Sequence, residues 1–273
     1  MTTNYTTKLK NKRIISINGD ESDIFLNNII TNDIKKIDNN SAIYSCLLTP
    51  QGKVISHFFI VKNNVEILVI IDDYLADEFI EKLNVYKLRS KVEINLKNEY
   101  EIIFSLSDNL KIKSIIEFND PRNKSFGKYF IVNQGDQFQI NFDANDFYLN
   151  FLIKNNLIDT IFRNIKDQYF SLELNMKELK AIDFSKGCYV GQENTSRMNL
   201  KNKISKRVLQ IESKSDLIPN EELKFEKEII GKILTSKPNF ALIKMKNFDL
   251  FINKHLSSNS CNDIRIIKPS WLN

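Results

Sequence analysis

The sequence predicts an α+β protein that ends in a small antiparallel β-barrel. Two apolar runs around a Pro/Gly turn, at residues 43–48 and 54–61, indicate a β-hairpin. Apolar residues at helical spacing, first at residues 20–30 and again at residues 73–86, indicate amphipathic helices beside that hairpin. From Val208 onward, short apolar runs alternate with turn residues over about 65 residues, which is typical of a barrel.

The first half of the chain alternates between strands and helices. The predicted elements are, in order, a strand at Arg13–Ile17, a helix capped by Asp20 or Ser22, the hairpin, a strand at Val65–Ile71, a helix from about Asp73 with Asp72 or Asp73 as its cap, and a strand at Lys91–Leu96. Cys46 lies within the hairpin pattern and is predicted to be a small buried hydrophobe. His57, in the second hairpin strand, is predicted to be structural rather than a ligand.

The trio Thr31-Asn32-Asp33 closes the first helix with short polar side chains. Such residues favour turns because their side chains bond to nearby backbone groups. Turn chemistry and contact with a ligand are equally consistent with this trio, and Asn32 and Asp33 are therefore candidate ligand-binding residues.

Beyond Tyr100 the pattern is strand-like as far as Gly127. Asp143 or Asn145 can cap a helix that carries Phe147 on its apolar face. Further on, Lys201–Arg207 holds four basic residues and reads as a linker. We therefore predict two parts, residues 1–203 and the barrel at residues 204–273.

Composition is that of an ordinary globular protein. Hydrophobic residues make up 42% and charged residues 27% of the 273 residues, which argues against disorder. The net charge of +5 mildly favours anionic partners, but 39 basic residues are dispersed among 34 acidic ones. We interpret this as a solvated, lysine-rich surface and not as a nucleic-acid-binding face. No long apolar stripe is left over, so we expect a monomer.

The cysteines and the apolar runs bear on compartment. Cys46, Cys188 and Cys261 are far apart and odd in number, which argues against a disulfide framework and for a reducing environment. The start of the chain shows no secretory signal, and no apolar run approaches membrane-spanning length. The sequence therefore predicts a cytoplasmic protein that does not bind membranes.

Several well-known site motifs are absent. The chain has no phosphate-binding loop, no dinucleotide fingerprint, no C-x-x-C and no H-E-x-x-H, and it contains only two histidines. We therefore expect no permanently bound metal.

One stretch of eight residues concentrates reactive and flexible residue types. It holds two of the seven glycines and one of the three cysteines. Its glycines permit unusual backbone dihedrals and close approach of a ligand or second backbone. Its cation could lower the pKa of the neighbouring thiol, and its polar side chains could bind a heterocycle or an anionic tail. By itself the stretch is also consistent with a structural turn and an incidental thiol. It reads Lys186-Gly187-Cys188-Tyr189-Val190-Gly191-Gln192-Glu193.

With its surroundings, this stretch resembles the signature of the YgfZ-type folate-binding proteins, which are relatives of the glycine-cleavage aminomethyltransferase (GcvT) and assist maturation of iron–sulfur enzymes. The resemblance covers nearly the whole chain. Its other blocks are Phe25-Leu26 through Thr31-Asn32-Asp33, Leu48-Thr49-Pro50-Gln51-Gly52-Lys53, Tyr86-Lys87-Leu88-Arg89-Ser90-Lys91-Val92, Asp120-Pro121-Arg122, Leu172-Glu173-Leu174-Asn175 and Pro269-Ser270-Trp271.

The resemblance implies an aminomethyltransferase-like fold, with two α/β subdomains, the second ferredoxin-like, around a central folate hole, and a C-terminal barrel. It implies that Glu173 binds the pterin edge, because a carboxylate can accept two parallel hydrogen bonds from an aminopyrimidine. Cys188 and Lys186 would form the functional loop beside the hole. The implied cofactor is tetrahydrofolate or a derivative. The remaining candidate ligand-binding residues are Tyr189, Gln192 and Glu193, with Asn32 and Asp33.

The implied function is that of an auxiliary factor in the assembly or repair of [4Fe–4S] enzymes, including enzymes that modify transfer RNA. Its partners would be folate, iron–sulfur assembly proteins and [4Fe–4S] client enzymes. The alternative is a folate-dependent one-carbon transferase, so the sequence leaves open whether the protein is an enzyme. A third hypothesis is a basic RNA-binding module. It is disfavoured because aromatic and basic residues do not interleave in the sequence.

Some positions depart from the family pattern. Ser56-His57 stands where the transferase carries a carboxylate that acts on the reacting nitrogen. Ser171 replaces a proline before Glu173, and Leu152, Asn156 and Ile158 replace an arginine and a G-x-P. These departures bear on folate affinity and on the loop geometry.

Overall fold

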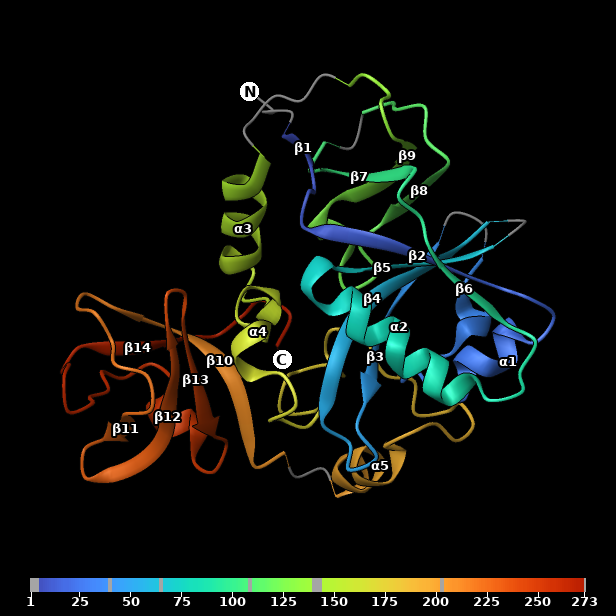
Figure 1. Cartoon of the computed structure of the whole chain (residues 1–273). Coiled ribbons are helices and arrows are strands. Elements are labelled where there is room, and N and C mark those ends of the chain that lie inside the picture. Colours follow the sequence, from blue (N-terminus) through green and yellow to red (C-terminus); the bar gives the residue numbers. More distant parts are fainter. Residues whose placement is uncertain are drawn as a thin grey trace. The chain divides into compact units, whose positions relative to one another are not determined.

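A computed structural model describes residues 5–38, 41–63, 66–107, 110–138, 144–201 and 204–272. The chain divides into two compact units, each with its own core. The first comprises Met1–Tyr148 and Leu179–Gln192, and the second comprises Leu149–Glu178 and Glu193–Asn273. Figure 1 labels the strands and most of the helices.

The first unit contains a five-stranded antiparallel sheet in the order β3-β4-β5-β2-β6. Its strands are β2 (Lys12–Asn18), β3 (Ala42–Leu48), β4 (Val54–Lys62), β5 (Ile67–Asp72) and β6 (Glu93–Leu96). The predicted hairpin is confirmed as β3 and β4. The strand predicted at Val65–Ile71 corresponds to β5, and Val65 lies outside the described residues.

A second, four-stranded antiparallel sheet in the same unit has the order β1-β7-β9-β8. Its strands are β1 (Thr6–Lys8), β7 (Tyr100–Ser105), β8 (Ile116–Asn119) and β9 (Lys128–Asn133). The sequence prediction did not include β1 or β9. β1 is three residues long and two of them are threonines, so it has no apolar run to reveal it.

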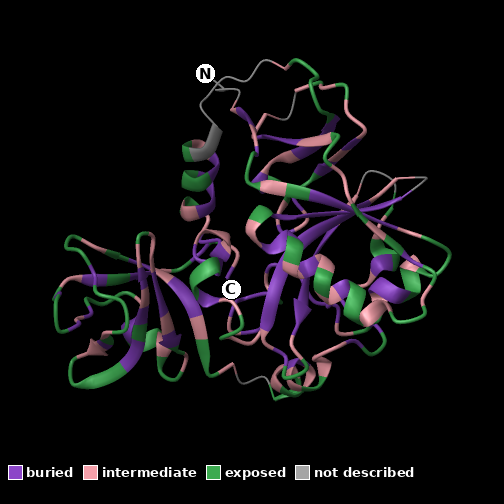
Figure 2. Ribbon diagram, viewed as in Figure 1, coloured by how far each residue is buried: buried purple, intermediate pink, exposed green. Residues whose placement is uncertain are grey.

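Aromatic side chains fill the space between these two sheets. Phe59 of β4 contacts Phe118 of β8 and Tyr129 of β9, with ring centroids 6.1 and 5.2 Å apart. The purple ribbon in Figure 2 shows that the strands of this unit are largely buried. His57 is buried here and meets the Tyr44 ring edge-on, which agrees with its predicted structural role.

The same core holds a fully buried ion pair. Arg122 donates to both carboxylate oxygens of Asp120, at 3.0 and 2.8 Å, and its guanidinium lies over the rings of Tyr44 and Phe59. The Tyr129 hydroxyl also donates to Asp120, at 3.2 Å. Paired charges of this kind are stable only when their hydrogen bonds are satisfied, and here they hold the block Asp120-Pro121-Arg122 in place.

The helices of the first unit are α1 (Ser22–Asn27), η1 (Ile34–Lys36), α2 (Asp73–Lys87) and η2 (Lys124–Phe126). α2 buries Leu75, Phe79 and Leu83, as its spacing predicts. α1 is shorter than predicted because Ile29 and Ile30 lie beyond its end. Ile30 forms a β-bridge with Leu47 instead, which carries the chain along the edge of β3.

The second unit contains the predicted C-terminal barrel. Its strands run in the order β11-β12-β13-β10-β14. They are β10 (Lys206–Ser213), β11 (Glu222–Phe225), β12 (Glu228–Ser236), β13 (Asn239–Lys244) and β14 (Ile264–Ile267). Bridges from Leu256 to Ile264 and from Ser257 to Lys224 join the two outer strands and close the barrel around an apolar core.

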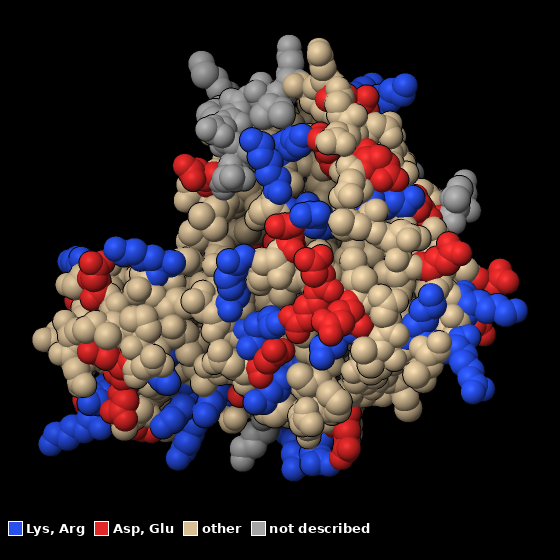
Figure 3. All heavy atoms as spheres, viewed as in Figure 1, with Lys and Arg blue, Asp and Glu red and all other residues tan. Residues whose placement is uncertain are grey.

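The remaining helices are α3 (Ala144–Lys154), η3 (Ile158–Thr160), α4 (Phe162–Ile165), α5 (Gln192–Leu200) and α6 (Phe248–Phe251). Of the two caps predicted for α3, Asp143 and the side chain of Asn145 lie outside the described residues. No helix in the described part of the chain is long and apolar enough to span a membrane. On the face shown in Figure 3, basic and acidic side chains are interspersed.

Candidate functional site

The segment Thr31-Asn32-Asp33 lies along the free edge of β3 in the first unit. Thr31 pairs with Cys46 as a strand would, because its N–H donates to the Cys46 carbonyl at 3.1 Å. Its hydroxyl then accepts from the Cys46 N–H at 2.9 Å and donates to the Ala181 carbonyl at 2.7 Å. Thr31 therefore joins β3 to the segment that leads into the cysteine-containing stretch.

Asn32 completes this junction. Its amide group donates to the carbonyls of Tyr44, at 2.8 Å, and Lys180, at 2.9 Å, while its oxygen accepts the Asp33 N–H at 2.9 Å. The side chain is buried and both of its donor hydrogens are used within the protein. Asp33 caps η1 by accepting the Lys35 N–H. The geometry favours the structural interpretation of Asn32, and the binding roles predicted for Asn32 and Asp33 stay predictions.

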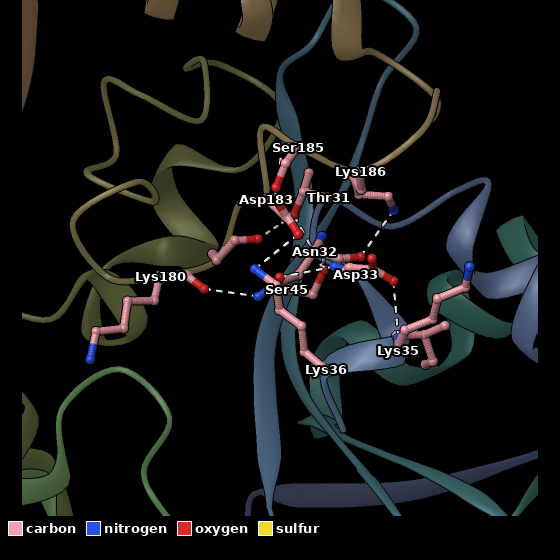
Figure 4. Close-up of polar contacts among 12 residues, drawn as sticks. Thr31, Asn32, Asp33, Lys35, Lys36, Ser45, Lys180, Asp183, Ser185 and Lys186 are labelled. Carbon is pink, nitrogen blue, oxygen red and sulfur yellow. Dashed lines mark hydrogen bonds and ion pairs between the residues drawn. The ribbon is translucent and has the colours of Figure 1, made fainter. Parts of the chain in front are cut away.

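Lys186 fixes the start of the cysteine-containing stretch. Its ammonium donates to the backbone carbonyls of Asn27, Ile30 and Asn32 at 2.6, 2.7 and 2.9 Å. Figure 4 shows the ammonium directed at Asn32. The residue is only 8% exposed. Burial lowers the pKa of Lys186 to about 8, against the charges of Asp33 and Asp183, which raise it. All three ammonium hydrogens thus tie the stretch to the end of α1.

Asp183 reinforces the same junction and was not among the predicted site residues. It accepts the Ser185 N–H at 2.8 Å and the Ser185 hydroxyl at 2.6 Å, and Lys36 pairs with its other oxygen at 2.9 Å. Although burial opposes it, these partners hold the pKa of Asp183 down at about 2. The only sequence signal was an acidic residue three positions before Lys186. This spacing is too common to predict a site residue.

The far end of the stretch is fixed by Gly191. Its φ is +79°, and a Cβ at this position would come within 2.9 Å of the Leu48 Cβ and against the Thr49 carbonyl in the turn between β3 and β4. Tyr189 is buried below the Lys186 ammonium, which lies 5.0 Å from its ring centroid, and the Gln192 side chain accepts the Tyr189 N–H at 3.3 Å. Glycine is therefore required at position 191 by both dihedral and contact.

Between these two anchors the chain is open. Gly187 and Cys188 are exposed, and a Cβ at position 187 would meet nothing within 4 Å. Gly187 has no positive φ, so the unusual dihedrals that both glycines permit are used only at Gly191. Lys186 directs its ammonium at carbonyls and makes no hydrogen bond to Cys188. The result is a thiol presented on a short loop, residues 187–190, between the buried Lys186 and the half-buried Gly191.

Glu173 and Glu193 belong to the second unit. One Glu173 oxygen accepts the Phe170 N–H at 3.0 Å, and its backbone carbonyl accepts the Val208 N–H at 2.8 Å. The side chain is half-buried, and a carboxylate has lone pairs for further donors. Glu193 is exposed at the start of α5 and pairs with Arg197.

The departures from the family pattern also have places in the fold. Ser56 and His57 are buried in β4, where neither supplies a carboxylate. The Ser171 hydroxyl shares a hydrogen bond with the Thr195 hydroxyl at 3.2 Å, which ties the segment before Glu173 to α5. Asn156 adopts a φ of +57° after α3, and both Leu152 and Ile158 are buried.

Known proteins resemble this chain in sequence. No protein-family model matches the chain. The chain is 30% identical over 231 residues to the iron–sulfur cluster assembly factor IBA57 homolog, mitochondrial, of Neurospora crassa, covering 74% of this chain and 52% of that protein. The homolog of the same name in Dictyostelium discoideum is 24% identical, with 92% and 77% covered.

The fold is that of an aminomethyltransferase. The crystal structure of glycine cleavage system aminomethyltransferase T from Bartonella henselae matches with a TM-score of 0.64, at 9% identity, over 98% of this chain and 86% of that one. The predicted fold class is thereby confirmed. The more specific resemblance to YgfZ-type proteins stays a prediction.

Two limits come with these relatives. The chain spans just over half the length of the first curated relatives that it matches. Those relatives are labelled mitochondrial, so the prediction of a cytoplasmic protein is wrong and the comparison points to the mitochondrion. The cysteine argument misled because free thiols exclude an oxidising compartment but do not distinguish one reducing compartment from another.

Proposed function

We propose that this protein assists the assembly or repair of iron–sulfur enzymes, with Cys188 as its functional thiol. The observation that carries the proposal is the exposure of Cys188 on a loop that is held on one side by the buried Lys186 and on the other by Gly191, which packs against the turn between β3 and β4. The names of the curated relatives, which are iron–sulfur cluster assembly factors, support it. Iron–sulfur clusters are the cargo in this proposal, and thiolates are their usual protein ligands.

The anchors hold the loop so that a partner protein can reach its thiol. Lys186 and Gly191 hold the backbone on both sides of Cys188, so the thiol is presented in one region while its own neighbourhood stays open to a second protein. A fixed but accessible thiol suits brief contact with a cluster or with a partner protein. No group of three or more histidine, cysteine or acidic side chains in the described part of the chain could hold a metal ion.

The test is complementation in cells that lack the endogenous protein, with iron–sulfur enzyme activities as the readout. Wild-type protein should restore these activities, including those of [4Fe–4S] enzymes that modify transfer RNA, and Cys188→Ala should not. Cys261→Ala is the matched control, because Cys261 is also a free thiol but is buried in the barrel. Full restoration by Cys188→Ala would contradict the proposal.

Tetrahydrofolate, or a derivative, is the ligand that we propose for the same protein, with Glu173 as its main contact. The fit rests on donor chemistry, because a half-buried carboxylate can accept the paired donors of an aminopyrimidine. Asn32 and Gln192, by contrast, use their side chains within the fold. We therefore assign Tyr189, Gln192 and Asn32 to support of the loop, and leave pterin recognition to Glu173.

Calorimetric titration of tetrahydrofolate into the full chain tests this assignment. Saturable binding that is lost in Glu173→Ala and kept in Glu193→Ala would support it. Glu193 is the matched control because its carboxylate is exposed and pairs with Arg197 on the same helix. An absence of binding by the wild type would mean that the fold has been kept while the ligand has changed.

One-carbon transfer is the less favoured function. It would need a carboxylate near the reacting nitrogen, and Ser56 and His57 occupy the corresponding stretch of β4. We therefore propose a maturation factor rather than a transferase.

A further inference from the structure

A β-turn at the end of α2 has a leucine at a position whose backbone dihedrals favour glycine. The Ser90 N–H donates to the Lys87 carbonyl at 2.8 Å, which closes the turn, and places Leu88 second in it. Leu88 has φ 47° and ψ −108°, close to the dihedrals of the second position of a type II′ turn. Glycine is the usual residue there because a Cβ is strained at such a φ.

Packing does not explain the leucine either. Leu88 is 87% exposed, more than any other exposed large hydrophobic side chain of the described residues. Val85, 63% exposed, lies one turn earlier on α2. The side chain thus stabilises neither the core nor the backbone of the turn, and a residue that breaks both rules in a native protein points to function.

Basic side chains surround this leucine. Lys87, Arg89 and Lys91 lie beside it along the turn, and none of the three makes an ion pair in the described structure. The turn is nevertheless held in place, since the Lys91 N–H donates to the Glu21 carboxylate at 2.6 Å. Beside it lies an open hollow of about 660 Å³ lined by Glu21, Leu88, Arg89 and Ser90. Figure 1 shows this end of α2 next to α1.

We propose that the turn Lys87–Lys91 docks on an acidic protein surface, with Leu88 inserted into an apolar pocket of that partner. Unpaired cations around an apolar centre match the usual arrangement of an interface, in which charges at the rim speed association and select the partner. The inference goes beyond the proposed function and does not use Cys188.

Two other occupants fit less well. An anionic membrane would gain little from one leucine, because membrane binding scales with the apolar area that is buried. Single-stranded nucleic acid would need an aromatic side chain on which to stack its bases, and the stretch Lys87-Leu88-Arg89-Ser90-Lys91 has none.

The experiment is photo-cross-linking of the full chain in its host cells, with the cross-linking residue at position 85. The reference is the same residue at position 200, because Leu200 is 82% exposed and lies in the second unit. We expect a discrete protein adduct from position 85 only, with the cross-link mapped to an acidic stretch of the partner.

Dependence on the turn decides the result. Leu88→Asp, and separately Arg89→Glu, should each reduce the adduct about tenfold, as expected for loss of an interface anchor, whereas Leu200→Asp should leave it unchanged. Unfolding of purified Leu88→Asp should match the wild type, because the side chain is exposed.

Three cross-linking results would overturn the proposal. They are the absence of an adduct from position 85, an adduct that Leu88→Asp and Arg89→Glu leave intact, and an adduct to RNA. Sedimentation with vesicles of phosphatidylcholine and phosphatidylglycerol, seen for the wild type and lost in Leu88→Asp, would replace the protein partner with a membrane. The readout is the adduct and not an enzyme activity, so it stands apart from the test of the proposed function.

Discussion

Two turns of the first unit each hold one side chain out to solvent, and they do so in opposite ways. At the end of the loop that carries Cys188 (residues 187–190, the cysteine loop), the position that needs a positive φ is filled by the anchor Gly191, at +79°. In the turn after α2, the corresponding position is filled by Leu88, at +47°. Cys188 is thus exposed by a backbone that obeys the local rules, whereas Leu88 is exposed by a backbone that breaks them.

The difference shows where each turn obtains its stability. The cysteine loop is anchored by the buried Lys186 on one side and by the close packing of Gly191 on the other, so its exposed thiol can be changed without disturbing the fold. The turn after α2 keeps its strained residue because the Ser90 and Lys91 hydrogen bonds and the packing of α2 determine its conformation. Strain that the surrounding structure tolerates is a sign of function rather than of stability.

The largest difference in stability should be between substitutions of the two glycines on either side of Cys188. Gly191→Ala should lower the free energy of unfolding by about 4 kcal/mol, because it adds strain at a positive φ to a clash with the turn between β3 and β4. Gly187→Ala, with open space around it, should change it by no more than about 0.5 kcal/mol. Urea unfolding of both variants measures this, and equal effects would contradict the anchoring described above.

The Lys186 anchor should have the next largest effect. Lys186→Met should cost about 2 to 3 kcal/mol, because it leaves two buried carbonyls and one part-buried carbonyl without their donor. Urea unfolding at pH 7 is the measurement, and a loss below about 0.5 kcal/mol, typical of a surface substitution, would show that water replaces the ammonium.

The pH dependence of Lys186 sharpens this prediction. Burial lowers its pKa in the folded protein to about 8 from an ordinary value of 10.5. Between these two pH values the unfolded chain binds more protons than the folded protein does, so the contribution of Lys186 to stability rises as pH increases from 8 to 10.5. The stability difference between wild type and Lys186→Met, followed across that window, should grow with pH; a difference that stays flat would mean that the ammonium keeps its ordinary pKa.

A substitution at Leu88 should raise the free energy of unfolding, whereas the substitutions at Gly191 and Lys186 lower it. Leu88→Gly should stabilise the protein by about 1 kcal/mol, because relief of the strained φ outweighs the added freedom of the unfolded chain. Thermal or urea unfolding measures the change. Destabilisation instead would show that the leucine contributes packing, and the two turns would then no longer differ in kind.

The smallest effect on stability should come from Cys188 itself. Cys188→Ala should change the free energy of unfolding by less than about 0.5 kcal/mol, because the thiol is exposed and makes no hydrogen bond in the described structure. A larger loss would assign Cys188 a structural role and would weaken its proposed function.

Much of this protein could be predicted from its sequence. Period-two and helical spacing identified the hairpin, α2 and the barrel, since these elements follow from which side chains must be buried. The cysteine stretch was identified by composition, because glycine, cysteine and charged residues rarely lie so close together. β1 was missed because its three residues gain their place from pairing with β7 and not from any apolar pattern.

Only the tertiary structure determined what the residues of the site do. Lys186 was predicted to act on the neighbouring thiol, but its partners are carbonyls 154 to 159 residues away in sequence. Asn32 similarly bonds to Lys180, 148 residues distant, and the demand for glycine at position 191 comes from Thr49 and Leu48. Local sequence determined which segments fold, because propensity and periodicity act over a few residues. Which donor meets which acceptor depended on contacts between distant segments, and no local pattern records them.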